Sequence, residues 1–497
     1  MRQSPHIARG VVAAGHPETA RAGADVLRAG GNAVDAAVAA VLASLAAEPL
    51  LTGLGAGGYM LVALPGAEPR LLDFFVEASG RGAEPEARGE LVPISVSFGD
   101  AIQVFNVGPA SIGTYGVPGG LADAAARFGS LPLSELAAPA VALARGGVEV
   151  NAVQAYVIEI LGEIATSTPE CAALFAPKGR LLREGDTFRN PDLADALELL
   201  GREGAAPFYT GEVAAAVIEW LDGRGAMLTA ADLAAYRVVD REPVRVAYRE
   251  RDVVTNPPPS AGGTLIAYAL ALLERSTDPL TPARLVDVMA AAQAERTPEF
   301  LDGLDDPGFL DRFLASRLGS TTHVSVLDAA GGACGVTCSN GEGSGIVVPG
   351  TGLHLNNMLG EQDLNPLGFH RHPAGRRMPS MMSPTMVLGE AGPELVLGSG
   401  GSNRIRSAII QAIVNVLDHR MDVAAAVRAP RLHFEDGVVY AEPGVDVGGL
   451  GRGEPALARF RELNLFFGGV HAVARDPNTG ELSGGGDPRR GGSVALA

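Results

Sequence analysis

Cysteine is scarce in this chain of 497 residues. Cys171, Cys334 and Cys338 are the only three, and so small and odd a number excludes a disulfide framework. A metal site would need more Cys or His side chains at ligand spacing. Cys334 and Cys338 fall on the same side of an expected strand, so we expect both thiols to be buried as small apolar groups.

Positive charge is also in short supply. The chain has 57 Asp and Glu against 39 Lys and Arg, which gives a formal net charge of −18. Such a chain repels nucleic acid and anionic membrane surfaces, so we expect neither as a partner. An acidic surface also serves the ordinary purpose of keeping a protein soluble.

Long uninterrupted apolar runs are missing. The most apolar stretch, residues 33–51, contains Asp35 and Glu48 and reaches Pro49 near its end, which favours a buried helix over a membrane span. Residues 1–20 lack the basic segment and following apolar segment of a secretion signal. From these two absences we expect a cytoplasmic protein.

Fingerprints of bound cofactors and metals are absent too. The GLGAGG stretch at 53–58 has dinucleotide-loop spacing, but it precedes an expected strand instead of opening a helix. The basic loop 366–377 holds His370 and His372 without Asp, Glu or Cys at ligand spacing, which disfavours a metal site. We therefore expect no cofactor and no metal, and a structural or carboxylate-binding role for an arginine of that loop.

What the chain does have is enough apolar material for a sizeable core, with 47% hydrophobic and 19% charged residues. Its length suits two or three average domains or one large sandwich, and no repeat of fixed period appears. Mixed helices, strands and hairpins indicate an α+β or layered α/β arrangement. Periodicity predicts helices over 17–29, 33–47, 131–145, 265–273 and 405–417, and a further helix that starts near Leu121 after a tight turn at 116–120. Alternation and turn residues predict strands within 52–64 and over 70–75, 244–248, 252–255, 321–328, 333–339, 384–388 and 394–397.

The strand expected at 321–328 begins with unusually polar residues. It reads TTHVSVLD, where a buried strand normally carries Val or Ile. If the bond between Ser320 and Thr321 were cut, Thr321 would gain a free α-amino group with a pKa of about 7.7–8, able to act as a base for its own hydroxyl. Two threonines at a strand start are also commonplace, so the residues alone leave an ordinary strand open.

Many segments together resemble the gamma-glutamyltransferase family of N-terminal-nucleophile hydrolases. They occur in the family's order and span essentially the whole chain. The matching segments include GGNAVDAAVAA (30–40), EP followed by GLGAGGYML (48–61), GVPGG (116–120), PPPSAGG (257–263), TTHVSVLD (321–328), LNNM (355–358), SMMSPT (380–385), GSGGSNRI (398–405), APRLH (429–433) and GDPRR (486–490).

The resemblance implies an α+β fold, specifically a four-layer αββα sandwich of the N-terminal nucleophile hydrolase type. It also implies a precursor that cuts itself between Ser320 and Thr321. Residues 1–320 would become a large subunit and 321–497 a small subunit, and the two would form one structural unit. The expected assembly is therefore a heterodimer of the chain's own fragments, open to further oligomerisation.

The same resemblance implies a reaction. Thr321 would attack a γ-glutamyl amide of the glutathione type, and water or an amino-acid acceptor would resolve the acyl-enzyme. Gly401 and Ser402 would supply backbone N–H groups for the developing oxyanion. Without the resemblance, their segment would be an ordinary turn from strand to helix.

Candidate substrate contacts follow from the family's motifs. Ser339 and Asn340 fall near a Thr and an Asn that the family uses around the nucleophile, although two residues are missing after them here. Glu361 stands where the family has an Asp for the donor's α-amino group. Ser380 matches the first of two serines that bind the α-carboxylate, and Met381 occupies the second position. Turn or cap roles remain open for each of them.

The largest departure from the family lies in residues 72–82. The family carries an arginine there that clamps the donor's α-carboxylate, whereas this chain has Phe75 and Val76. Arg81 could replace that arginine or could be a surface charge. The departure favours an alternative to a glutathione-type enzyme, an acylase of the same fold acting on a glutaryl or cephalosporin-type amide. A third interpretation is an unprocessed, inactive binding homologue, and the intact TTH at 321–323 argues against it.

Overall fold

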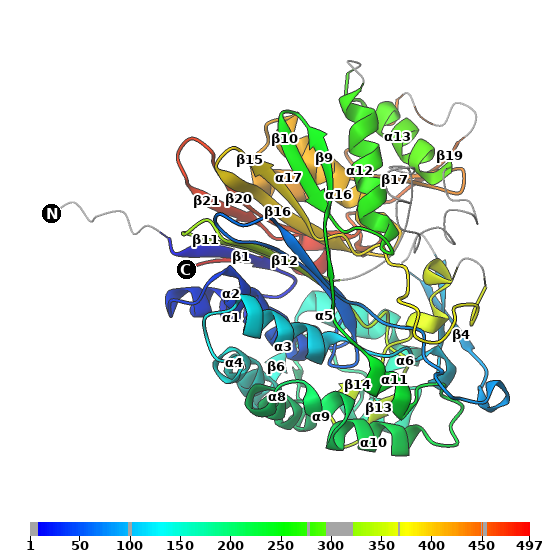
Figure 1. Cartoon of the computed structure of the whole chain (residues 1–497). Coiled ribbons are helices and arrows are strands. Elements are labelled where there is room, and N and C mark those ends of the chain that lie inside the picture. Colours follow the sequence, from blue (N-terminus) through cyan, green and yellow to red (C-terminus); the bar gives the residue numbers. More distant parts are fainter. Residues whose placement is uncertain are drawn as a thin grey trace.

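The computed structural model describes residues 8–97, 102–275, 279–294, 322–365, 368–448, 450 and 455–497. Two β-sheets lie face to face at its centre, and helices cover the outer face of each sheet (Figure 1). This arrangement confirms the predicted α+β class and the four-layer αββα sandwich. No described helix is long and apolar enough to cross a membrane.

The first sheet has seven strands, and every neighbouring pair in it is antiparallel. The predicted hairpin is confirmed as β11 and β12, which are adjacent strands in the middle of this sheet. In spatial order the strands are β22 (Ser493–Leu496), β1 (Gly10–Ala14), β11 (Thr322–Asp328), β12 (Ala333–Ser339), β2 (Gly57–Ala63), β3 (Arg70–Phe74) and β8 (Val239–Arg241).

The second sheet has six antiparallel strands and includes those predicted at 244–248, 252–255, 384–388 and 394–397. Its spatial order is β21 (Leu482–Gly485), β20 (Gly469–Arg475), β16 (Gly392–Gly400), β15 (Thr385–Gly389), β10 (Arg251–Thr255) and β9 (Val244–Tyr248).

The period of two along β11 explains how the layers join. Val324 and Val326 pack into the core beneath the helices, whereas Leu327 packs into the apolar cluster between the sheets.

The helices on the first sheet include α1 (Pro17–Arg28), α2 (Ala33–Ala47), α3 (Val117–Phe128) and α4 (Leu133–Gly146). The helices on the second sheet include α12 (Ala261–Glu274), α16 (Arg404–Leu417) and α17 (Val423–Arg428).

Helix α2 is buried on every face, as its largely apolar sequence predicts. Asn32 caps its start by accepting hydrogen bonds from the N–H groups of Val34 and Asp35, and the Asp35 carboxylate accepts the Asn32 N–H in return. The helix ends at Ala47, and the side chain of its C-cap residue, Glu48, is buried. The C-terminal end of α2 therefore delivers a carboxyl group into the interior.

The remaining elements surround these four layers. They include α5 (Ala152–Ile160), α6 (Gly162–Ala165), α7 (Pro169–Phe175), α8 (Pro191–Glu203), α9 (Ala206–Tyr209), α10 (Glu212–Leu221), α11 (Ala230–Ala235), α13 (Pro282–Ala294), β4 (Val92–Ser97), β5 (Ile102–Val107), β6 (Val148–Glu149), β7 (Thr187–Phe188), β13 (Val347–Val348), β14 (Leu353–His354), β17 (Leu432–Glu435), β18 (Val438–Ala441) and β19 (Ala456–Arg459).

The start of α3 differs from its prediction, whereas the burial of two cysteines agrees with theirs. The helix expected to start near Leu121 begins earlier, at Val117, because Pro118 is well suited to the first turn of a helix. The segment 116–120 is therefore mostly helix and not a separate turn. Cys334 and Cys338 are free thiols buried in the core, as predicted.

Candidate active site

The loop between β16 and α16 has a strained backbone. Gly401 has φ of 121° and Ser402 has φ of 53°, both in the region that favours glycine. A Cβ atom at position 401 would lie 2.6 Å from Cα of Gly468, so no larger residue fits there. Just before the loop, the Ser399 hydroxyl accepts a hydrogen bond from the N–H of Gly469 at 3.1 Å, which ties the end of β16 to β20. Strain of this kind is typical of functional loops.

The end of β12 supplies two more of the predicted residues. The Ser339 hydroxyl accepts a hydrogen bond from the N–H of Gly341 at 2.9 Å. Asn340 is completely buried, and neither atom of its side-chain amide has a hydrogen-bond partner in the described chain. Buried amides are nearly always paired, so an unpaired one beside a pocket is a candidate ligand contact.

Ser339, Gly401 and Ser402 line one pocket. The structure thus brings together three of the residues that the sequence assigns to catalysis, from the end of β12 and from the loop before α16. Other lining residues are Leu51, Gln103, Phe105, Val157, Ile160, Leu161, Gly341, Glu342, Arg404, Leu465 and Arg490.

The predicted nucleophile and cleavage site, Thr321 and Ser320, lie outside the described residues, as does the segment 303–319 that precedes them. Strand β11 begins at Thr322, the residue that follows the predicted nucleophile. The described site therefore starts one residue after Thr321.

Glu48 is a buried carboxyl group next to the start of β11. Its two oxygens accept hydrogen bonds from the hydroxyls of Thr322, at 3.1 Å, and Thr19, at 3.0 Å. Burial raises the pKa of Glu48 to about 7, although the two hydroxyls and the charge of Arg490 oppose that rise. No role was predicted for Glu48, although it is a carboxylate at the end of an apolar helix and the first residue of the family segment 48–61.

A chain of polar groups between the sheets accounts for the polar start of β11. His323 shares hydrogen bonds of 2.8 Å with the hydroxyls of Thr337 and Ser325, and Ser325 donates to the carbonyl of His471 at 3.0 Å. Burial lowers the pKa of His323 well below its usual value, so its imidazole is neutral at physiological pH. Each polar side chain here has a partner, which permits its burial.

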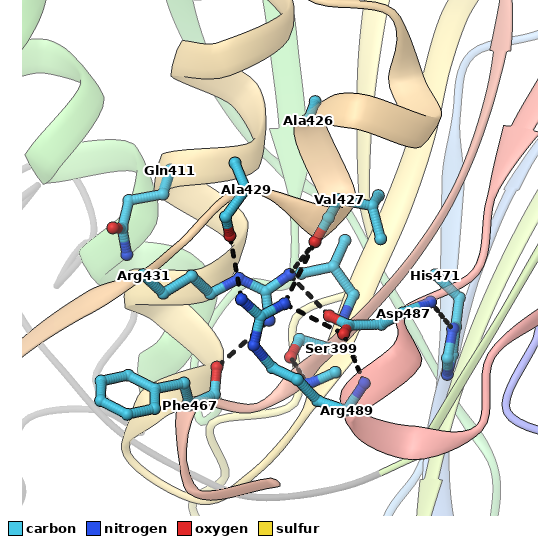
Figure 2. A network of polar contacts seen from close by, with 12 residues as sticks. Ser399, Gln411, Ala426, Val427, Ala429, Arg431, Phe467, His471, Asp487 and Arg489 are labelled. Atoms are coloured by element: carbon cyan, nitrogen blue, oxygen red, sulfur yellow. Dashed lines mark hydrogen bonds and ion pairs between the residues drawn. The ribbon is translucent and has the colours of Figure 1, made fainter. Parts of the chain in front are cut away.

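The APRLH and GDPRR motifs meet in a buried network of charges (Figure 2). Asp487 forms ion pairs with Arg431 at 2.6 Å and with Arg489 at 3.1 Å, and Arg489 also donates to Glu442 at 2.7 Å. Burial alone would raise the pKa of Asp487, but the two arginines outweigh it and lower the pKa. Asp487 also accepts the N–H of Val470, so the network is joined to the start of β20.

Glu361 lies against the loop that follows β12. Its carboxylate accepts a hydrogen bond from the Asn357 amide at 3.0 Å. A Cβ atom at Gly341 would lie 2.9 Å from Oε1 of Glu361, so the carboxylate borders the loop that lines the pocket. Its predicted contact with a substrate amino group stays a prediction.

Ser380 and Met381 are not among the residues that line this pocket. The Ser380 hydroxyl accepts the N–H of Met382 at 3.1 Å, and its carbonyl accepts the N–H of Ala261 at 2.8 Å. The Met381 side chain packs into the core between the second sheet and its helices. Both residues have structural contacts in this state of the chain.

Arg81 also lies away from the pocket lining. Its guanidinium forms ion pairs with Glu77 at 3.0 Å and Asp232 at 3.4 Å. The family's arginine position is apolar here, since Phe75 and Val76 belong to the cluster between the sheets. The structure does not bring Arg81 to the pocket that joins Ser339 to the glycine loop.

The basic loop contributes a buried structural arginine. Arg377 donates to the Tyr236 hydroxyl at 2.6 Å and lies 3.6 Å from the carboxylate of Asp73 and 3.4 Å from that of Glu77. These contacts fix the segment that carries Phe75. Among the described residues, no group of three His, Cys, Asp or Glu side chains is placed to hold a metal ion.

Comparison with known proteins identifies the family of the chain. A family profile described as Gamma-glutamyltranspeptidase matches residues 19–312 and 309–497. The chain belongs to the gamma-glutamyltranspeptidase family. This confirms the resemblance drawn from the motifs, and it identifies the chain as an enzyme of a hydrolase and transferase family.

Individual members of the gamma-glutamyltranspeptidase family match over nearly their full length. Acylase ACY 1 proenzyme of Pseudomonas sp. (strain SE83) is 32% identical, over 96% of this chain and 91% of that protein. Glutathione hydrolase proenzyme of Escherichia coli (strain K12) is 30% identical, over 97% of this chain and 90% of that protein. The crystal structure of cephalosporin acylase from Bacillus halodurans superimposes with a TM-score of 0.82 at 27% identity, covering 98% of this chain and 96% of that one. The N-terminal nucleophile hydrolase fold is therefore confirmed.

Proposed function

We propose that this chain is a self-processing enzyme that hydrolyses or transfers the acyl group of γ-glutamyl amides through an acyl-enzyme on Thr321. The observation that carries the proposal is the pocket that joins Ser339 to Gly401 and Ser402. Strand β11, which directly follows Thr321, is a neighbour of β12 in the same sheet.

In the proposed maturation, the Thr321 hydroxyl attacks the carbonyl carbon of Ser320. The peptide C–N bond breaks, an ester forms, and the proton of the hydroxyl moves to the nitrogen, which becomes the α-amino group of Thr321. Water then hydrolyses the ester and releases the carboxyl terminus of Ser320. The new amine can act as the base in catalysis because its ordinary pKa is about 7.7–8.

In the proposed turnover, the Thr321 oxygen attacks the γ-carbonyl of the substrate and the amine leaves with a proton. Water or the amino group of an acceptor then attacks the ester and regenerates the hydroxyl. The N–H groups of Gly401 and Ser402 are the proposed donors to the oxyanion in both steps. The strained loop favours this role because its backbone is held in place before the substrate arrives.

The sheet topology supports a mature enzyme made of both fragments, 1–320 and 321–497. In the first sheet, β11 and β12 of the small fragment lie between β1 and β2 of the large fragment. After cleavage the fragments could separate only by exposing the buried faces of these strands. We therefore propose one structural unit, a heterodimer of the chain's own fragments in the cytoplasm.

A second candidate function is that of an acylase acting on amides without the amino-acid head. It is favoured by the apolar surroundings of Phe75 and Val76, which replace the family's carboxylate-binding arginine. One similar protein is named an acylase and another a glutathione hydrolase, so relatives of both kinds match this chain.

Rates on matched anilides test the proposal. Purified protein would be assayed with γ-glutamyl and glutaryl p-nitroanilide, beside Thr321→Ala and the neighbouring control Thr322→Ser. We expect turnover of at least one anilide, none by Thr321→Ala, and retained activity in Thr322→Ser. Preference for the glutaryl compound would favour the acylase, and failure to cleave either amide would contradict the proposal in favour of an inactive homologue.

A further inference from the structure

Arg490 brings a positive charge to the pocket without a dedicated partner. Its side chain lines the pocket, and its Nε atom is buried. No hydrogen bond or ion pair joins its guanidinium to any residue of the described chain. Burial lowers the pKa of Arg490 to about 10, so the group is still a cation at neutral pH. A cation in this position invites an anion that is not part of the protein.

The nearby carboxylates do not account for this arginine. Asp487 already forms ion pairs with Arg431 and Arg489 (Figure 2). Glu48 is satisfied by two hydroxyls, and its pKa of about 7 leaves much of it neutral at physiological pH. The need to balance the charge of a structural carboxylate therefore does not explain the position of Arg490.

The pocket lining has a positive balance. Arg404 is a second cation in it, with its guanidinium held by the carbonyl of Phe466 at 2.9 Å and the Gln103 amide at 3.3 Å. Glu342 is the one acidic residue of the described lining and only partly offsets the two arginines. Neutral ligands would leave the excess charge uncompensated.

The rest of the lining is mainly apolar and reaches the loop proposed to hold the oxyanion. Leu51, Phe105 and Leu161 are among its apolar members. A Cβ atom at Gly401 would lie 3.5 Å from Nη2 of Arg490, so the guanidinium borders that loop. A ligand there would have an apolar body and a negative end within reach of the reacting amide.

We propose that Arg490 binds a carboxylate of the substrate, with Arg404 adding to the local positive potential and the apolar lining holding the adjoining carbon chain. The proposal rests on the proposed function. It assigns carboxylate recognition to a different wall of the site from the one that carries Phe75 and Val76. The carboxylate can belong to the acyl group or to the amine that leaves or accepts, and the two are distinguished below.

Two pairs of amides test the proposal by kcat/KM. Glutaryl p-nitroanilide and its terminal amide differ in a carboxylate on the acyl side. The γ-glutamyl amides of 4-aminobenzoate and 4-aminobenzamide differ in a carboxylate on the amine side. Wild type would be compared with Arg490→Gln, with Arg490→Lys, and with Arg202→Gln as a control at an exposed arginine.

We expect wild type to prefer the carboxylate in one pair, and that pair identifies the side. Arg490→Gln should reduce the preference by about tenfold to a hundredfold, the range for charge-assisted hydrogen bonds. Arg490→Lys should keep part of the preference and Arg202→Gln all of it. An unchanged preference in a folded Arg490→Gln, judged by its melting temperature, overturns the proposal.

Calorimetric binding of glutarate and its diamide separates this result from failure of the proposed function. If no amide is cleaved, the proposed function fails, but the carboxylate site is still measured. Tighter binding of glutarate that is lost in Arg490→Gln supports the site. Equal affinities for the two ligands in wild type contradict it.

Discussion

Glu48 is a buried carboxyl group that holds Thr322, the residue after the proposed nucleophile. At the scale of single residues, such groups determine how the site responds to pH. The sequence shows that Glu48 interrupts an apolar stretch. Its hydroxyl partners and its proximity to Arg490 could not be predicted, because Thr19, Thr322 and Arg490 come from distant segments that meet only in the folded chain.

Replacement of Glu48 should change how stability depends on pH. The folded pKa of about 7 lies above the ordinary value of 4.5, so the stability that Glu48 contributes is present below pH 4.5 and is lost as pH rises through 7. Relative to Glu48→Gln, wild type should lose about 3 kcal/mol of unfolding free energy between pH 4.5 and 8. Urea unfolding of both proteins across this range measures the change, and a difference independent of pH would contradict it.

At the scale of elements, periodicity was a reliable guide. It predicted α2, the hairpin of β11 and β12, and the turn between β16 and α16, because each has a regular apolar pattern or glycine at its ends. It placed the start of α3 too late, since a glycine-rich turn and a helix opened by proline look alike in sequence. A site role was predicted for only three of the pocket-lining residues, Ser339, Gly401 and Ser402. The motifs at 398–405 and 486–490 also contain the lining residues Arg404 and Arg490.

The loop before α16 should tolerate no side chain at Gly401. In Gly401→Ala, the positive φ and the contact with Gly468 would displace the proposed oxyanion donors, so we expect a loss of activity of at least about a hundredfold. Gly392→Ala is the matched control, because Gly392 has φ of 111° and nothing within 4 Å of a new Cβ. It should cost about 1–2 kcal/mol of stability and little activity. Equal activity loss in both variants would argue against the proposed role.

The charge network that joins β20 to its surroundings should be costly to break. Asp487→Asn would leave Arg431 and Arg489 facing each other without the shared carboxylate, and we expect a loss of about 3–5 kcal/mol in unfolding free energy at pH 7. Glu203→Gln removes a partner from an exposed pair and should cost less than about 1 kcal/mol. Denaturant unfolding compares the two variants, and similar small losses would refute a stabilising role for the network.

At the scale of the whole molecule, the buried histidines should make the protein sensitive to acid. Burial lowers the pKa values of His16, His354 and His471 to about 4 from the ordinary 6.5. The stability that these histidines contribute is present above pH 6.5 and is lost as pH falls toward 4. Glu48 acts in the opposite direction, because its contribution to stability increases as pH falls. Thermal unfolding should show a falling melting temperature across this range. His354→Leu should flatten the decline, exposed His419→Gln should not, and parallel curves for all three proteins would contradict the account.

The whole-molecule architecture was the most predictable feature, because many ordered motifs agree on one family and one sandwich. What sequence could not supply is the pairing of charges across the fold. Arg377 and Arg431 are engaged by buried carboxylates, whereas Arg490 is left facing the pocket. That difference depends on packing between distant elements and has no signature in the local sequence.

The proposed function requires that the chain cuts itself before Thr321 and uses this residue as its nucleophile. Denaturing gel electrophoresis of the purified protein, with N-terminal sequencing of the fragments and Thr321→Ala beside it, tests the claim most directly. The account predicts two bands for wild type, the smaller beginning Thr-Thr-His-Val-Ser, and a single uncut band for Thr321→Ala. A wild-type chain that stays uncut after long incubation would contradict it.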